Sequence, residues 1–141
     1  MGESENSKLK TQGQRMEKVN WQKMKFAYED LDVWNKSVDF AIEVINIVEK
    51  IDTDRKHYRL LEQIEASSTS IAINIAEGKG RFSNKEFKHF LYIARGSLYE
   101  TITLLEIYRR KGWISDQEYT QLEVKGKEIA AMIKGLINSI H

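Results

Sequence analysis

The chain has 141 residues, of which 41% are hydrophobic and 30% are charged, and it contains neither Pro nor Cys. This composition is typical of a soluble globular domain, and the absence of Cys excludes disulfides, thiolate zinc sites and a cysteine nucleophile. The net charge is only +1, which argues against a polycation that binds duplex nucleic acid over its whole surface.

Residues 1–25 are polar and carry six basic and three acidic side chains, whereas the rest of the chain has a net charge of −2. Because they lack a sustained apolar period, we expect a flexible N-terminal arm over 1–25 and a folded domain over 26–141. Trp21 and Met24 are the apolar exceptions. They either lie in an unstructured arm or attach the arm to the bundle or to a neighbouring subunit. Met16 is an alternative start of the natural chain.

No apolar run reaches the roughly 18 residues that a membrane helix needs, and the N-terminus lacks the apolar core of a signal peptide. The sequence therefore predicts a cytoplasmic protein without a membrane partner.

The first helix is predicted from Leu31, and two apolar stripes run along it. The first stripe has the 3-4 spacing of a bundle core and consists of Leu31, Trp34, Val38, Ala41, Ile45 and Val48. The second lies about 100° around the helix and consists of Val33, Phe40, Val44, Ile47 and Ile51. Two stripes indicate either a helix buried deeply among its partners or a second contact with another subunit.

A second helix is predicted from about His57 to Glu77, with small side chains over residues 66–72 that allow a neighbouring helix to approach closely. Three serines and a threonine in this run have no histidine at a fixed spacing. We therefore interpret them as hydroxyls that bond to the preceding turn, not as catalytic groups.

Gly78 and Gly80 follow, and we expect them to end the second helix by supplying left-handed or open backbone conformations. Ser83 and Glu86 then form a capping box that starts a third helix. Its predicted core residues are Phe87, Leu91, Ala94, Leu98, Thr101, Leu105 and Tyr108.

Residues 111–114 interrupt the pattern, and a second capping box, Ser115 with Glu118, starts the fourth helix. Its predicted core residues are Tyr119, Leu122, Gly126, Ile129, Ile133, Leu136 and Ile140. Four helices with short connections predict an all-α protein, an antiparallel up-down-up-down four-helix bundle that follows the flexible N-terminal arm.

Three segments, Phe26–Trp34, Ser70–Arg81 and Phe90–Glu100, resemble a bacterial four-helix bundle family first noticed as products of intervening sequences in large-subunit ribosomal RNA genes. The resemblance covers about residues 26–137. Two positions depart from the family pattern: Ala72 replaces the usual Pro, which predicts a more regular second helix, and Glu65 replaces a common basic residue.

The resemblance implies a non-enzymatic homo-oligomer without a cofactor. Relatives include the accessory protein of diversity-generating retroelements, a ring-like pentamer that binds a reverse transcriptase and nucleic acid. By this resemblance we expect a pentameric adaptor for RNA, single-stranded DNA, or a nucleic-acid enzyme such as a reverse transcriptase. The alternative is a protein–protein interaction scaffold for a neighbouring gene product.

The candidate nucleic-acid site is the connection between the second and third helices. Between residues 77 and 95 there are five basic and two acidic side chains; the basic ones are Lys79, Arg81, Lys85, Lys88 and Arg95. Free N–H groups at a helix start, its dipole and nearby cations suit a phosphate. The alternative is an ordinary solvated turn in which Glu77 pairs with Arg81.

Asn74, Glu77, Gly78 and Gly80 form the structural part of this motif. We interpret Asn74 and Glu77 as a buried amide and carboxylate that tie the turn together, because no nucleophile or base nearby completes a catalytic site. Glu86 and His89 have the i, i+3 spacing of di-iron bundles, but such a site needs a second pair that His57 and His141 do not supply. We therefore predict no metal site.

Overall fold

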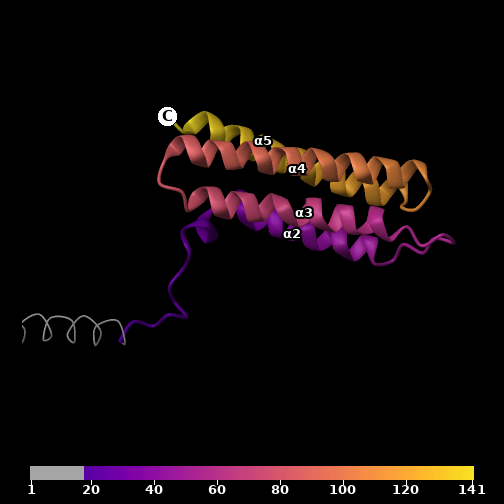
Figure 1. Ribbon diagram of the computed structural model, residues 1–141, viewed down its shortest axis with the longest axis horizontal. Helices are drawn as coiled ribbons and strands as arrows, with labels where there is room; N and C mark the ends of the chain where they lie inside the picture. The colour runs from indigo at the N-terminus through magenta and orange to yellow at the C-terminus, as the bar shows by residue number, and fades with distance from the viewer. Residues whose placement is uncertain (1–17) are drawn as a thin grey trace, which may run out of the picture.

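The computed structural model describes residues 18–141, so Met16 and the predicted arm as far as residue 17 lie outside it. A short 3-10 helix, η1, precedes four long α-helices (Figure 1). Their bounds are η1 Ala27–Asp30, α2 Asp32–Val48, α3 Tyr58–Lys79, α4 Asn84–Arg110 and α5 Asp116–Ser139. The described residues contain no strand, and the all-α prediction is confirmed.

The four helices form two layers, α2 beside α3 and α4 beside α5, and consecutive helices run in opposite directions (Figure 1). Each helix packs on two others, α3 with α4 most extensively, and neither described diagonal pair brings its Cα atoms within 8 Å. This is the predicted up-down-up-down bundle. The α3–α4 connection, the start of α2 and the end of α5 all lie at one end of it (Figure 1).

Capping groups set the starts of the last two helices. The Glu86 amide donates to the Ser83 hydroxyl (3.1 Å) at the start of α4. The capping box at the start of α5 is complete, because the Glu118 amide donates to the Ser115 hydroxyl (3.0 Å) and the Ser115 amide to the Glu118 carboxylate (2.9 Å). Both predicted starts are confirmed.

The end of α3 differs from the prediction. Gly78 lies inside the helix, which continues to Lys79, and Gly80 has an ordinary right-handed conformation (φ −81°, ψ −3°). The expectation of open or left-handed glycines is therefore wrong. Gly78 is needed for packing instead, because a Cβ there would lie 2.6 Å from Phe90 Cβ and 3.0 Å from Phe87 Cδ1.

The left-handed glycine lies at the other end of the bundle. Gly112 has φ +74° and follows the last turn of α4. Its amide donates to the Arg109 carbonyl (3.0 Å) and the Trp113 amide donates to the Tyr108 carbonyl (2.9 Å), the pair of bonds that defines a Schellman motif.

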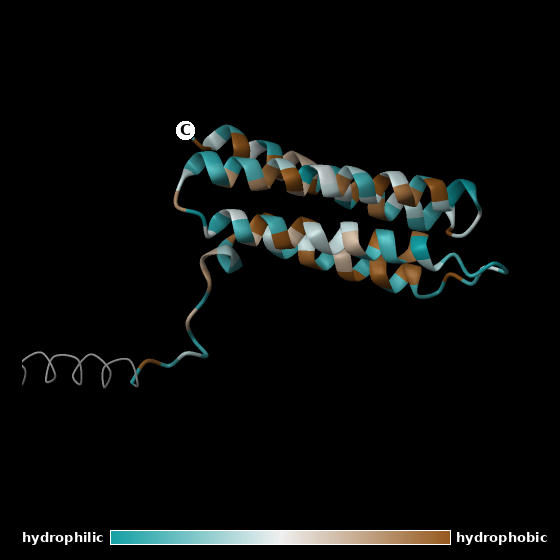
Figure 2. Ribbon diagram, viewed as in Figure 1, coloured by the Kyte–Doolittle hydropathy of each residue, from teal (hydrophilic) through white to brown (hydrophobic). Residues whose placement is uncertain are grey.

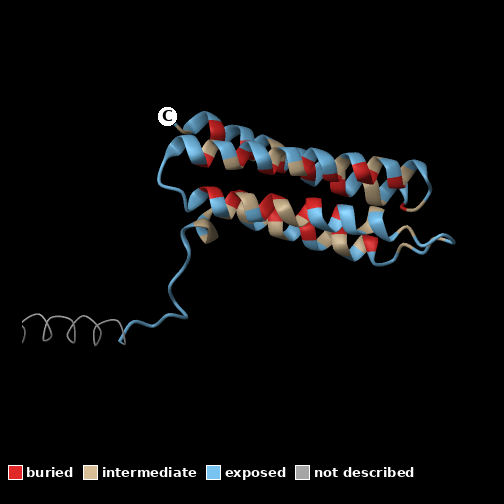
Figure 3. Ribbon diagram, viewed as in Figure 1, coloured by how far each residue is buried: buried red, intermediate tan, exposed pale blue. Residues whose placement is uncertain are grey.

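The core lies between the two layers, where buried residues line the facing sides of the helices (Figure 3) and apolar residues recur along each helix (Figure 2). All seven predicted core residues of α4 are buried, as are four of α5: Leu122, Gly126, Ile129 and Ile133. Tyr108 donates its hydroxyl to the Leu60 carbonyl, and burial raises the pKa of this phenol to about 12. Ala72 is buried within an unbroken α3, which confirms the regular helix expected there.

The predicted core stripe of α2 needs correction. Trp34, Val38 and Ile45 are only half-buried, whereas Phe40 and Val44 of the second stripe are in the core. The inward stripe passes through Ser37, which interrupts its apolar pattern in the sequence. This serine is buried without an unpaired group because its hydroxyl donates to the Val33 carbonyl (2.6 Å).

Hydroxyl groups join α3 to α4. Ser67 and Thr101, both buried, are hydrogen-bonded through their side chains (2.8 Å), and so are Ser70 and Ser97 (2.9 Å). The Asn74 amide donates to the Ser70 hydroxyl (2.9 Å) and carbonyl (2.8 Å). The hydroxyls of α3 that the sequence singles out therefore have structural partners.

An ion-pair cluster joins α4 to α5 at the end of the bundle that carries Gly112. The Arg109 guanidinium donates to both carboxylate oxygens of Glu106 (2.7 and 2.9 Å) and pairs with Asp116 (3.3 Å). Arg110 also bonds to Glu106 (2.8 Å). Hydrogen bonds from Arg109 and then Arg110 lower the pKa of Glu106 to about 2.

We expect this cluster to make stability depend on pH. A carboxylate whose pKa is lower in the folded state stabilises the fold above its ordinary pKa of 4.5, and this contribution is lost as the pH falls toward 2. The Glu106→Gln variant should therefore be less stable than wild type at neutral pH, and the difference should vanish near pH 2. Denaturant unfolding across this range measures it; a difference independent of pH would contradict it.

Candidate nucleic-acid interface

The α3–α4 connection, residues 80–83, presents an aromatic ring to solvent between basic groups. Phe82 is fully exposed. The Arg81 guanidinium lies 4.7 Å from the centre of the Phe90 ring and the Lys79 ammonium 5.6 Å from that of Phe87, so both cations are held against the start of α4. We call residues 79–85 the hinge.

The exposed side of α4 continues the hinge as a row of cations and aromatic rings. The α4 stripe consists of Lys85, Lys88, Tyr92, Arg95 and Tyr99. At 100° per residue these side chains fall within an arc of about 80°, turned away from the core. Between residues 84 and 100, the acidic side chains of α4 lie at least about 100° around the helix axis from the centre of that arc.

Arg95 is positioned by two rings of the stripe. Its guanidinium carbon lies 5.0 Å from the centre of Tyr92 and 5.9 Å from that of Tyr99. Both tyrosines are exposed, and each leaves part of its ring open to solvent. Guanidinium and phenol groups in one row can contact phosphates and stacked bases together.

A groove of about 280 Å³ between α4 and α5 adjoins Tyr99. It is lined by Leu98, Tyr99, Ile102, Thr103, Glu123, Gly126, Lys127 and Ala130. A Cβ at Gly126 would lie 2.7 Å from Ile102 Cδ1, so the end of the Ile102 side chain would have to shift. The stripe therefore ends beside a mainly apolar depression with Lys127 on its border.

All five predicted nucleic-acid residues lie on the hinge or the α4 stripe. The charge count in the sequence does not identify Phe82, Tyr92 and Tyr99, although two signals could have done so. Phe82 stands in a turn next to a cap residue, where a core role is unfavourable. Tyr92 and Tyr99 have the helical spacing of Lys85 and Lys88, not that of the core.

The predicted tie between Asn74 and Glu77 is only half present. Asn74 is half-buried and belongs to the hydroxyl network between α3 and α4, but Glu77 is exposed. Between residues 18 and 141 no ion pair joins Glu77 to Arg81, since Arg81 stacks on Phe90 instead. The ion pair between Glu77 and Arg81 that the solvated-turn alternative predicts is therefore not observed.

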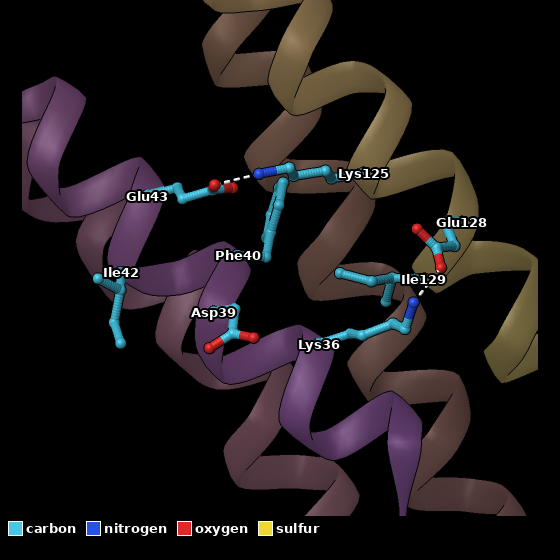
Figure 4. A pocket seen from close by; sticks show the side chains of 8 residues that line it. All are labelled: Lys36, Asp39, Phe40, Ile42, Glu43, Lys125, Glu128 and Ile129. Atoms are coloured by element: carbon cyan, nitrogen blue, oxygen red, sulfur yellow. Dashed lines mark hydrogen bonds and ion pairs between the residues drawn. The ribbon is translucent and has the colours of Figure 1, made fainter.

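Another cavity, of about 410 Å³, lies between α2 and α5 (Figure 4). Two ion pairs cross it, Lys36 with Glu128 and Lys125 with Glu43, and hydrogen bonding to Glu128 raises the pKa of Lys36. Both pairs join α2 to α5, while Ile42 points away from them (Figure 4). These groups are engaged in holding two helices together.

The described part of the chain contains no group of three or more His, Asp or Glu residues placed to hold a metal ion. His89 is exposed and lies edge-on to Phe90, with ring centres 6.0 Å apart. Over residues 18–141, every helix is too short or too polar to cross a bilayer.

The sequence and the fold are both similar to those of known proteins. Residues 29–135 match the family model described as 23S rRNA-intervening sequence protein. A crystal structure of a protein of unknown function from the S23 ribosomal protein family of Bacteroides thetaiotaomicron is 29% identical, with a TM-score of 0.71. The similarity covers 76% of this chain and 99% of that one. No curated protein is significantly similar to the chain.

Proposed function

The chain belongs to the 23S rRNA-intervening sequence protein family, and from this premise we propose that it is a non-enzymatic, homo-oligomeric adaptor whose hinge and α4 stripe bind single-stranded nucleic acid. The observation that carries the proposal is the fully exposed Phe82 among Lys79, Arg81 and Lys85. A ring in that setting can stack on a base while the cations contact the flanking phosphates.

The distribution of charge supports one nucleic-acid surface. Helices α2 and α3 together carry six acidic and three basic residues, whereas α4 carries three acidic and five basic ones. A polyanion is therefore attracted to the α4 side and repelled from the α2–α3 side. We propose RNA as the ligand.

Single strands fit this surface better than a duplex. The cations alternate with aromatic rings along one helix face, and each ring can stack only on an unpaired base. The groove beside Tyr99 offers an apolar recess of about 280 Å³ for a further base. The proposed function involves no catalysis by the hydroxyls of α3, because these hydroxyls are hydrogen-bonded within the α3–α4 interface.

The Phe82→Ala variant tests the proposal. Loss of one stacked base should weaken binding of a fluorescently labelled single-stranded RNA by about 5- to 150-fold, since stacking contributes about 1–3 kcal/mol per base. Tyr58→Ala is the matched control, because Tyr58 is an exposed aromatic at the other end of the bundle. Fluorescence anisotropy gives both affinities.

Equal affinity of the Phe82→Ala and Tyr58→Ala proteins would refute the role of the hinge. If wild type binds neither RNA nor single-stranded DNA, the chain is instead a protein–protein scaffold, with a reverse transcriptase or another neighbouring gene product as candidate partner. Purification of the tagged protein with its bound molecules, followed by RNA sequencing and protein identification, distinguishes these outcomes.

A further inference from the structure

Residues 18–26, the docking arm, project from the bundle and are all exposed (Figure 1). Four of them are large and apolar: Val19 is 38% exposed, Trp21 and Met24 are 57% exposed, and Phe26 is 68% exposed. Exposed apolar side chains of this size in one short segment are characteristic of a surface that is buried in a complex.

The base of the arm contacts the short helix η1. The Phe26 amide donates to the Glu29 carboxylate (2.8 Å), and Lys25 pairs with Asp30 (3.6 Å). The Phe26 ring stacks on Tyr28 at 5.5 Å, and Tyr28 contacts Trp34 of α2 at 4.9 Å. The base of the arm is thus held on the bundle while the rest of the arm extends away from it (Figure 1).

The outward side of the α2–α3 layer carries two exposed isoleucines, Ile42 on α2 and Ile73 on α3, and we call this side the α2–α3 face. Ile42 is 51% exposed and Ile73 is 52% exposed, one on each helix. Trp34, Val38 and Ile45, three residues of the first predicted stripe, are half-buried on α2 near Ile42. The faces of α2 and α3 on which these residues lie are assigned from the 3.6-residue period of the helix.

Charge and length match the arm to this face. The arm carries three lysines, Lys18, Lys23 and Lys25, and no acidic residue, which gives +3, whereas α2 and α3 together carry −3. Nine residues span at most about 30 Å, and the 17 residues of α2 extend over about 25 Å. The arm is therefore apolar and basic, and the two helices that carry the α2–α3 face are acidic in sum.

We propose that the docking arm of one copy packs on the α2–α3 face of a second copy, with Trp21 and Met24 buried against Ile42 and Ile73. This inference rests on the homo-oligomer of the proposed function and names the segment and the surface that form it. It leaves the α4 stripe free, because that stripe belongs to the other layer.

Sedimentation velocity on the full chain tests the inference. The Trp21→Ala/Met24→Ala variant and the Ile42→Glu/Ile73→Glu variant should each raise the dissociation constant of the assembly at least 10-fold. Val124→Glu, at an exposed apolar position of α5, is the matched control and should assemble like wild type. Circular dichroism establishes that each variant is folded.

Mixing the two double variants provides a second measurement. One variant keeps an intact α2–α3 face and the other an intact arm, so an arm that docks between copies should form a mixed complex from them. A monomeric wild type, an unchanged assembly in the arm variant, or failure of the variants to form a mixed complex would each overturn the inference.

The RNA assay on the same samples separates this inference from the proposed function. We expect the arm variant to bind a short single-stranded RNA as wild type does. An arm variant that loses RNA affinity while keeping its assembly would show that the arm contacts nucleic acid, which overturns the inference. Loss of assembly with full RNA binding supports both.

Discussion

Replacing Lys79, Arg81 and Lys85 by glutamate is expected to weaken binding of single-stranded RNA by on the order of 100-fold or more. The three cations lie on the hinge, Arg81 and Lys79 against the rings of Phe90 and Phe87. In the proposed complex, reversal would remove three phosphate contacts and place three carboxylates beside the backbone of the strand. Anisotropy titrations at several salt concentrations measure the change.

The salt dependence makes this prediction specific. Each phosphate contact to a single strand contributes about −0.7 to the slope of log affinity against log salt concentration. The slope of the triple variant should therefore be less steep than that of wild type by about 2. Reversal of Lys50, Arg55 and Lys56, in and beside the α2–α3 connection, changes the net charge equally and is the matched control. If both variants lost RNA affinity equally, binding would depend on net charge and not on a local site.

Gly78→Ala is expected to destabilise the fold by about 1–3 kcal/mol, the usual cost of overpacking a core. The added Cβ would lie 2.6 Å from Phe90 Cβ and 3.3 Å from the Phe87 carbonyl oxygen. Neither atom is the free end of a flexible side chain, so α3 and α4 must separate at this point. Denaturant unfolding measures the change in the free energy of unfolding.

Two other glycines supply controls for this substitution. Gly96 lies inside α4, and no neighbouring atom lies within 4 Å of the place that an added Cβ would take, so Gly96→Ala should stabilise the fold by about 0.5–1 kcal/mol. Gly80 has a right-handed backbone and ordinary contacts, so Gly80→Ala should be tolerated. A stabilising Gly78→Ala substitution would contradict the close approach of the two helices.

The helices and their order could be predicted because local chemistry determines them. Ser83 and Ser115 cap the helices that follow, and the 3-4 spacing from Phe87 to Tyr108 marks one buried face. The inward face of α2 could not be predicted in this way. Its two stripes are similarly apolar, and the stripe that enters the core contains Ser37, whose pairing with its own helix is visible only in the structure.

The basic residues of the candidate site could be predicted from the sequence, but their contacts could not. The sequence shows an excess of basic residues near the hinge, but it does not show which cations lie against rings. The pairing of Arg81 with Phe90, in place of Glu77, depends on how α3 and α4 approach each other. For the same reason a glycine predicted to turn the chain, Gly78, proves to be a site of helix contact.

The two layers of the bundle carry different surfaces, and this separation has a consequence for avidity. Copies joined by docking arms on α2–α3 faces would keep every α4 stripe accessible, so one strand could contact several subunits at once. Each added contact would then be intramolecular, with an effective concentration set by the strand between the sites. Affinity would rise steeply once the strand is long enough to reach a second hinge, without any new contact within a subunit.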